Sequence, residues 1–207
     1  VYYGRNSWAG ALTRNGRPVY DSPVQNATAH FMQNMLYVAG TSPGETALPR
    51  ALYGEQYRAQ EIESADTQFI RGETADGVRL TYAATHACLD QIDPATDFLF
   101  SRGRIRWHAR GAATQVYLTT RTGEELIEEI PPGRMHVNLK VFIDAAIALS
   151  EGRPPVSTIE NAWQHTALVE SLFEHVPIRT IEKSSRKTHR IRGEWFAPDT
   201  AGENTVI

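Results

Sequence analysis

Apolar residues recur at helical spacing over residues 23–39 and predict a helix with one buried face. This apolar stripe consists of Val24, Ala27, Phe31, Met35 and Val38. Ser22 is placed to cap the helix, with Pro23 as the first helical residue and Gln25 as the partner of Ser22 in a capping box. Gly40 follows the last apolar position and predicts a left-handed stop.

A second face of the same predicted helix carries neutral hydrogen-bonding groups and one histidine: Asn26, His30, Asn34 and Tyr37. The solvent-facing side of a helix usually carries Lys, Glu and Arg, so this face is typical of a helix that lines a binding site for a polar ligand. Imidazole titrates near neutral pH, which makes His30 the candidate for proton transfer. The alternative is a histidine that caps or fills a helix interface. His165, on a later predicted helix, is expected to have a packing role.

A turn is predicted at Asn15-Gly16, before this helix. Short strand-like segments separated by turn residues follow the helix, with a strong hairpin signal at Asp76-Gly77, and they predict a meander of antiparallel strands. Two further helices are expected, one between Pro132 and Gly152 and one opening at Ser157. The expected strands cover residues 51–60, 66–74, 78–87, 98–101, 104–108, 115–121, 124–130 and 178–181.

This order of elements predicts an α+β fold, with an open, mostly antiparallel sheet and helices packed on one face. The other face of the sheet then needs a partner, either another subunit or another domain. We expect it to be free for oligomerisation and the chain to form a homo-oligomer through it. Residues 1–182 are predicted to form one α+β domain. Residues 183–207 are polar and weakly patterned, and they are expected to form a C-terminal strand or tail of that domain.

Composition narrows the possible partners and the compartment. With 207 residues, 41% of them hydrophobic, the chain is long enough to bury a substantial core. The net charge of −3 gives no general attraction to nucleic acid or anionic membranes. We assign the basic run 183–192 to a solvated strand or tail, with a nucleic-acid contact as the weaker alternative. No apolar run is long enough to span a bilayer. A single cysteine, Cys88, excludes an internal disulfide and is typical of a cytoplasmic protein.

The usual local cofactor and metal motifs are absent from the sequence. It contains neither G-x-G-x-x-G nor G-x-x-x-x-G-K-[ST], and none of its histidines forms H-E-x-x-H. We therefore expect no cofactor and no metal to be bound by this chain, with a metal site built from distant strands left open. The chain begins at Val1 rather than Met, from which we expect that residues precede it.

A glycine-bounded loop near the start carries Arg5, Asn6 and Trp8. Hydrogen-bond donors beside an aromatic ring suit a carbohydrate, because its hydroxyl groups need partners and its C–H faces pack on rings. The loop is therefore a second candidate for substrate binding. The alternative is a surface loop with one buried tryptophan.

Several short motifs, in this order and spacing, resemble the glucose–fructose oxidoreductase / inositol dehydrogenase family. The resemblance covers about residues 1–182 and only the second, C-terminal domain of that family. It implies that residues 1–182 are a substrate-binding and oligomerisation domain. The histidine of the family's Asp-x-Gly-x-His pattern falls on His30, whereas Asn26 and Thr28 replace its aspartate and glycine. The motifs are Asn6–Gly10, Asp21–Pro23, Asn26–His30 with Gly40, Tyr57–Ala59, Ile62–Glu63, Asp66–Thr67, and Phe142 with Asp144–Ala145.

The resemblance implies an NAD(P)-dependent enzyme whose N-terminal Rossmann domain, absent from this chain, holds the cofactor and a catalytic lysine. It implies that His30 is catalytic and that Asn26, Asn34, Arg5, Asn6 and Trp8 orient a sugar or cyclitol. Asn26 cannot tune an imidazole as a carboxylate does, so it binds a substrate hydroxyl or Asp21 lies close by. This chain alone is expected to be inactive. The alternative is a non-catalytic carbohydrate-binding or dimerisation module.

Overall fold

The computed structural model describes residues 2–4, 6–42, 44–88, 92–108, 113–133, 137–191 and 202–206. The chain divides into two compact units. Unit 1 consists of Val1–Gln91 and Ile159–Ile207, and unit 2 of Ile92–Thr158. The predicted α+β class is confirmed, with the strands of each unit forming their own four-stranded sheet.

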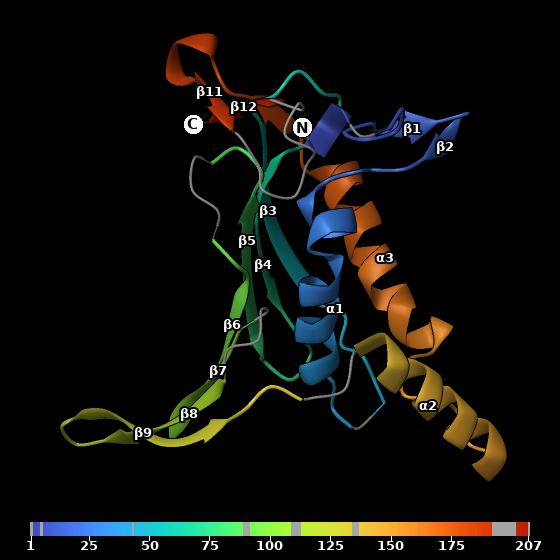
Figure 1. Cartoon of the computed structure of the whole chain (residues 1–207), viewed down its shortest axis with the longest axis vertical. Helices are drawn as coiled ribbons and strands as arrows, with labels where there is room; N and C mark the ends of the chain where they lie inside the picture. The colour runs from blue at the N-terminus through green and yellow to red at the C-terminus, as the bar shows by residue number, and fades with distance from the viewer. Residues whose placement is uncertain are drawn as a thin grey trace. The chain divides into compact units, whose positions relative to one another are not determined.

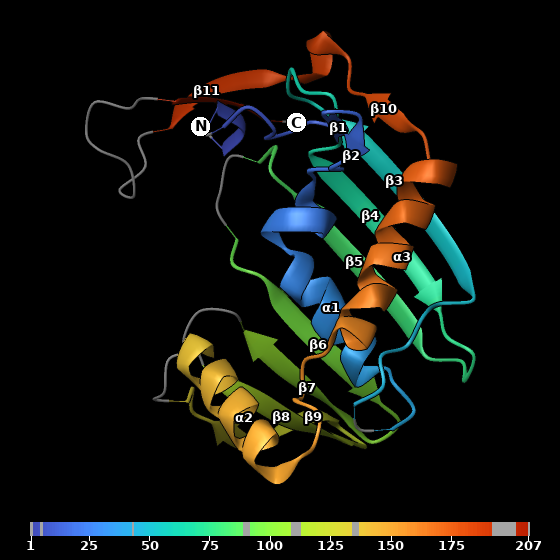
Figure 2. The same cartoon turned by 90° about the vertical axis from the view of Figure 1, so that its right-hand side faces the viewer.

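The main sheet of unit 1 has the strand order β10-β3-β4-β5, in which β10 is parallel to β3 and the other neighbours are antiparallel. Its strands are β3 (Ala51–Arg58), β4 (Thr67–Glu73), β5 (Arg79–Thr85) and β10 (Ile178–Thr180). The predicted hairpin at Asp76-Gly77 joins β4 to β5 and is confirmed. Helices α1 (Ala29–Val38) and α3 (Ile159–His175) lie across the same face of this sheet (Figures 1 and 2).

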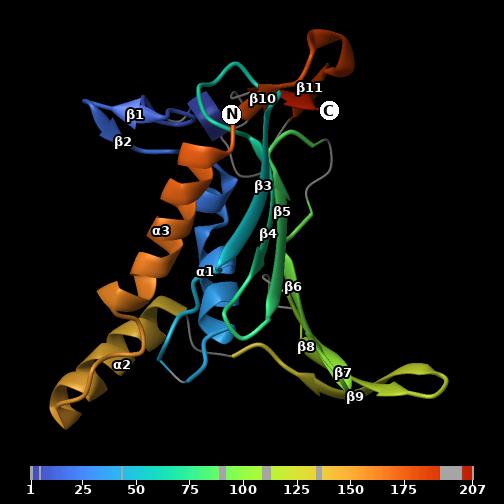
Figure 3. The ribbon, with the colours of Figure 1, turned by 180° about the vertical axis from the view of Figure 1, so that it is seen from behind.

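The core of unit 1 lies between these two helices and the sheet. Figure 3 shows the two helices and the sheet from behind. Each large apolar side chain buried there stabilises the fold by about 1.5–3 kcal/mol. The buried cluster consists of Val24, Met32, Leu36, Ile70, Tyr82, Leu168, Val169 and Leu172.

The start of the first predicted helix differs from the expected capped α-helix. Residues Pro23–Ala27 form a π-helical turn, η2, before α1 begins at Ala29. Ser22 makes no side-chain cap bond, and its buried hydroxyl has no partner among the described residues, so the predicted capping box is wrong. The Val24 N–H is instead bound by the Gln68 side chain of β4.

The π-turn also explains why only part of the predicted apolar stripe, Val24 and Met35, belongs to or packs against the core. A π-turn adds one residue to a helical turn and so rotates every later side chain. Val24 is buried as expected, but Met32 and Leu36 follow it into the core, and Val38 is 55% exposed. Phe31 and Met35 are only half-buried.

Gly40 ends the first helix for a reason other than the predicted left-handed stop, since it is not among the residues with positive φ. A Cβ atom built on Gly40 would lie 2.0 Å from the Glu45 carbonyl oxygen. Glycine is therefore required by the close approach of the following loop to the end of α1.

Smaller elements complete unit 1. The turn predicted at Asn15-Gly16 joins β1 to β2 and is confirmed, with φ values of 51° and 73°. These elements are η1 (Tyr2–Gly4), β1 (Thr13–Arg14), β2 (Arg17–Pro18), η3 (Lys183–Ser185), β11 (Lys187–Ile191) and β12 (Gly202–Val206). Strands β11 and β12 pair antiparallel, and the assignment of 183–207 to the domain 1–182 remains a prediction.

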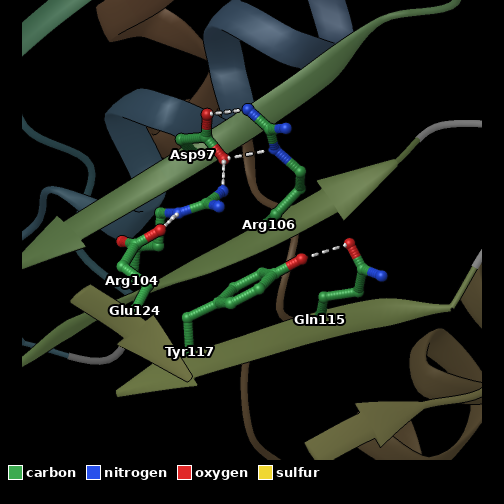
Figure 4. A network of polar contacts seen from close by, with 6 residues as sticks. All are labelled: Asp97, Arg104, Arg106, Gln115, Tyr117 and Glu124. Carbon is green, nitrogen blue, oxygen red and sulfur yellow. Dashed lines mark hydrogen bonds and ion pairs between the residues drawn. The ribbon is translucent and has the colours of Figure 1, made fainter. Parts of the chain in front are cut away.

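Unit 2 contains an antiparallel meander, as predicted, in the order β6-β7-β8-β9. Its elements are β6 (Ala95–Phe100), β7 (Gly103–His108), β8 (Thr114–Thr120), β9 (Gly123–Ile130) and α2 (Val137–Glu151). Among its described residues, Ala148 is the only one that is buried. One face of the sheet carries a network of charged and polar side chains (Figure 4).

Candidate functional site

Asp21 connects two of the segments that the sequence singles out. Its side chain is buried, at 1% exposure, and one carboxylate oxygen accepts the Gly10 N–H at 2.6 Å. The other oxygen accepts Asn26 Nδ2, also at 2.6 Å. A buried carboxylate needs such donors because it has lost its contacts with water. Asp21 therefore brings the loop 6–10 and the turn before His30 together.

The loop 6–10 is held by its own side chains and by the segment 62–64. Asn6 Oδ1 accepts the N–H groups of Trp8 at 3.1 Å and Ala9 at 2.8 Å, so this oxygen shapes the loop itself. Gly10 has a φ of +73°, and a Cβ there would lie 2.7 Å from Ile62 Cγ2. Only glycine satisfies both requirements. Asn6 is exposed and Trp8 is half-buried, whereas Arg5 lies outside the described residues.

The π-turn before His30 is tied to the sheet. Thr28 Oγ1 donates to the Pro23 carbonyl at 2.6 Å and shares a hydrogen bond with the Tyr82 hydroxyl of β5. Burial raises the pKa of Tyr82 far above its ordinary value, while the bond to Thr28 acts in the opposite direction. Tyr82 therefore stays a neutral phenol at physiological pH.

A chain of buried amides continues from this turn through the sheet. Gln68 Oε1 accepts the Val24 N–H at 2.9 Å, and Gln68 Nε2 donates to Gln56 Oε1 at 2.7 Å. Gln56 Nε2 in turn donates to the Val176 carbonyl at 2.8 Å, just beyond α3. Both glutamines are 1% exposed, so the turn is anchored in the interior of unit 1.

His30 lies in the first turn of α1 and is exposed, and Asn34 is exposed on the next turn of the same helix. Asn26 is half-buried against Asp21. Hence the structure joins Asn26 to the loop of Asn6 and Trp8 through Asp21, and it places His30 and Asn34 on the helix that follows.

His165, on α3, contacts the same turn from the opposite helix. Its Nε2 lies 2.9 Å from the Val24 carbonyl oxygen. Burial lowers the pKa of His165, the bond to Val24 opposes this shift, and the charge of His30 lowers the pKa further. His30 and His165 lie on α1 and α3, two helices that pack against each other.

Sequence reasoning did not assign Gln68 or Tyr82 to the site, and it gave His165 only a packing role. No local pattern marks them, because each contacts the turn from a distant strand or helix. Asp21 was noted only as a possible neighbour of Asn26, and its contact with Asn26 is confirmed.

Within the described ranges, no group of three or more His, Cys, Asp or Glu side chains could hold a metal ion. Nor does any helix of the described chain have the length and apolar character needed to cross a membrane.

No protein-family profile and no curated protein matches this chain. Solved structures do match. The UDP-N-acetylglucosamine 3-dehydrogenase GnnA from Acidithiobacillus ferrooxidans has 12% identity and a TM-score of 0.61, over 81% of this chain and 51% of that one. The WlbA dehydrogenase from Bordetella pertussis, in complex with NADH and UDP-GlcNAcA, has 16% identity and a TM-score of 0.57, over 84% of this chain and 48% of that one.

An oxidoreductase from Agrobacterium radiobacter, in complex with NAD+, L-tartaric acid and magnesium, has 18% identity and a TM-score of 0.52, over 73% of this chain and 46% of that one. The chain thus spans about half the length of the solved structures that it matches. At these identities the likeness shows a shared fold. The chain has the fold of part of these oxidoreductases, which confirms the fold that the family resemblance implied.

Proposed function

We propose that this chain is the substrate-binding part of an NAD(P)-dependent oxidoreductase that acts on a hydroxyl or carbonyl group of a sugar or cyclitol. The observation that carries the proposal is the meeting, at buried Asp21, of the loop 6–10 with the turn before exposed His30. The fold shared with part of several oxidoreductases supports it. The complete protein would also contain a Rossmann domain with the catalytic lysine.

His30 exchanges the proton in this proposal. When a substrate alcohol is oxidised, the His30 imidazole would accept the hydroxyl proton, and in the reverse reaction it would return that proton to the carbonyl oxygen. A nicotinamide cofactor, NAD or NADP held by the Rossmann domain, would supply the hydride chemistry at the same carbon. An exposed imidazole on the first turn of a helix is accessible to a substrate, as proton exchange requires.

Asn26, Asn34, Arg5, Asn6 and Trp8 orient the substrate in this proposal. Because Asn26 Nδ2 donates to Asp21, the amide group is held in one orientation and its oxygen can accept a substrate hydroxyl. The Trp8 ring offers a surface for a sugar C–H face. A sugar is favoured because GnnA is a UDP-N-acetylglucosamine 3-dehydrogenase and WlbA was solved with UDP-GlcNAcA.

We also propose that the protein is cytoplasmic and forms a homo-oligomer through the sheet face opposite α1 and α3. Gly54 and Gln56 of β3 face the region of Leu172 and Val176, so the alternate residues Tyr53, Glu55 and Tyr57 face away. Tyr53 is 54% exposed, and tyrosine is enriched in protein interfaces.

The test is His30→Ala in the complete protein, assayed with UDP-N-acetylglucosamine, glucose and myo-inositol. Loss of the proton acceptor should lower kcat by about 100-fold or more and leave cofactor Kd unchanged. His175→Ala is the control, since His175 is exposed at the end of α3 and bonds only the Ser171 carbonyl of its own helix among its described contacts.

Equal loss of turnover and cofactor binding, or no loss of turnover, would contradict the role of His30. If the wild-type protein binds a sugar without any nicotinamide-dependent turnover, the chain is a non-catalytic carbohydrate-binding module. If it only self-associates, it is a dimerisation module.

A further inference from the structure

The peptide groups of Val24 are held from two sides by side chains distant in sequence. The Val24 N–H donates to Gln68 Oε1 of β4 at 2.9 Å, and the Val24 carbonyl lies 2.9 Å from His165 Nε2 of α3. Val24 is fully buried, so neither group can bond to water instead. Leaving either unpaired would destabilise this turn.

The π-turn creates the need for the His165 bond. In a continuous α-helix the Thr28 N–H would bond the Val24 carbonyl, four residues earlier. Here the Thr28 N–H donates to the Pro23 carbonyl at 2.9 Å, and Thr28 Oγ1 donates to the same oxygen at 2.6 Å. The Val24 carbonyl thereby loses its α-helical donor, and the imidazole of His165 takes that place.

The same π-turn decides where His30 points. The extra residue turns Met32 and Leu36 into the core and leaves His30 and Asn34 on the surface. An α-helical turn would rotate α1 back by one residue, which would carry His30 away from its present direction. Whatever holds the π-turn therefore holds the orientation of His30.

We propose that His165 is a positioning residue for His30: its Nε2–H holds the Val24 carbonyl and so maintains the π-turn from which α1 projects. The positioning of a reacting group rests on the proposed function, whereas the hydrogen bond from His165 to the Val24 carbonyl does not. A carbonyl oxygen only accepts hydrogen bonds, so Nε2 carries the hydrogen and the neutral ring has its lone pair on Nδ1.

The electrostatics agree with this geometry. Burial and the nearby His30 both lower the pKa of His165, so its ring is neutral at physiological pH. A neutral ring keeps its bond to Val24 without placing a permanent positive charge beside the group that has to accept a proton.

The experiment compares His165→Ala with His165→Gln. The glutamine Nε2 can reach the position of the histidine Nε2 and donate to the same carbonyl, whereas alanine has no donor. His175→Ala is the matched control, because His175 Nδ1 also contacts a backbone carbonyl, that of Ser171, but within α3 itself. The first readout is the amide nitrogen resonance of Gln25, which shares its peptide plane with the Val24 carbonyl, together with amide hydrogen exchange over residues 25–29.

In the 207-residue chain, His165→Ala should shift the Gln25 resonance and speed exchange at 25–29, and His165→Gln should restore both. In the complete protein, His165→Ala should lower kcat by about tenfold with KM within about twofold, and His165→Gln should recover most of the rate. His175→Ala should leave every readout unchanged.

Two results overturn the proposal. The first is an unchanged Gln25 resonance and unchanged exchange in His165→Ala, which would show that His165 does not hold the Val24 carbonyl. The second is a shifted resonance with unchanged kcat, which would leave His165 with a packing role only. If the wild-type complete protein has no turnover, the proposed function fails, and the resonance and exchange data still decide whether His165 holds the turn.

Discussion

The two units of this chain hold their sheets in different ways. In unit 1, α1 and α3 cover one face of the sheet. Polar side chains of that covered face, such as Gln56 and Gln68, are buried and hydrogen-bonded. In unit 2, the described strands are half-buried or exposed, and charged pairs cross them. There Asp97 binds Arg106 through both carboxylate oxygens, at 2.7 and 2.5 Å, and Arg104 packs over the Tyr117 ring at 4.1 Å (Figure 4).

This contrast explains why all the described residues of the candidate site belong to unit 1. A side chain that must meet a substrate in one orientation needs packed neighbours and paired polar groups behind it. Asn26 and the turn before His30 have such support from Asp21, Gln68 and Tyr82. Exposed ion pairs contribute little stability and are weakened by salt. The sheet of unit 2 would therefore hold a substrate-binding side chain less rigidly than unit 1 does.

The largest expected effect compares one leucine from each unit. Leu172 is fully buried in the core of unit 1, whereas Leu126 on β9 is 45% exposed. Leu172→Ala should lower the free energy of unfolding by about 3 kcal/mol through lost burial and a residual cavity, and Leu126→Ala by less than about 1 kcal/mol. Urea unfolding measures both. Equal losses would show that the two units do not differ as described.

A glutamine pair tests buried against exposed hydrogen bonds. Gln68→Ala leaves the buried Val24 N–H and the Gln56 Oε1 atom without their partner and should cost about 2 kcal/mol of unfolding free energy. Gln115→Ala removes bonds to Tyr117 and Glu129 in unit 2 and should cost about 0.5 kcal/mol or less. Thermal unfolding of the two variants would rank them, and a larger loss for Gln115→Ala would contradict the contrast.

Salt should affect unit 2 selectively. Asp97→Asn removes a carboxylate that contacts Arg104 and Arg106, with its side chain 33% exposed. The expected loss is under about 1 kcal/mol at low salt and close to zero at high salt, because ions screen such pairs. Amide hydrogen exchange in β7 reports this locally. The loss caused by Gln68→Ala should not depend on salt, and a salt-independent loss for Asp97→Asn would argue against the ion-pair account.

The smallest expected effect is on the pH dependence of stability. The pKa of His165 is lowered, mainly by burial, from its ordinary 6.5. The unfolded chain therefore binds this proton more readily, so stability is fully present above pH 6.5 and declines as pH falls through the folded pKa. His165→Gln should reduce that decline, and His175→Ala should not.

Unfolding midpoints measured from neutral pH downward would test this, and an unchanged slope in His165→Gln would contradict it. In unit 2, Arg106 lowers the pKa of Asp97 from 3.8. The stability that Asp97 contributes is present above pH 3.8 and is lost as pH falls through its folded pKa, so the two units respond to acid in separate ranges.

Local patterns were sufficient for the elements of this fold. The hairpin at Asp76-Gly77, the meander of unit 2 and the three helices were all predicted, because alternation, helical spacing and turn residues act over a few neighbouring positions. The short motifs around His30 also led to the correct fold, which the solved oxidoreductases share in part. The roles of His30, Asn26 and Asn34 remain proposals.

The sequence did not determine which face of the first helix is buried or which residues hold its first turn. The stripe Val24 to Val38 assumes an even 3.6 residues per turn, and the π-turn at Pro23–Ala27 breaks that count. Three partners hold the turn: Gln68, Tyr82 and His165, which are 44, 54 and 141 positions from the residues they bind. Because these long-range hydrogen bonds replace the local caps at Ser22 and Gln25, only packing against the sheet and α3 determines which way His30 faces.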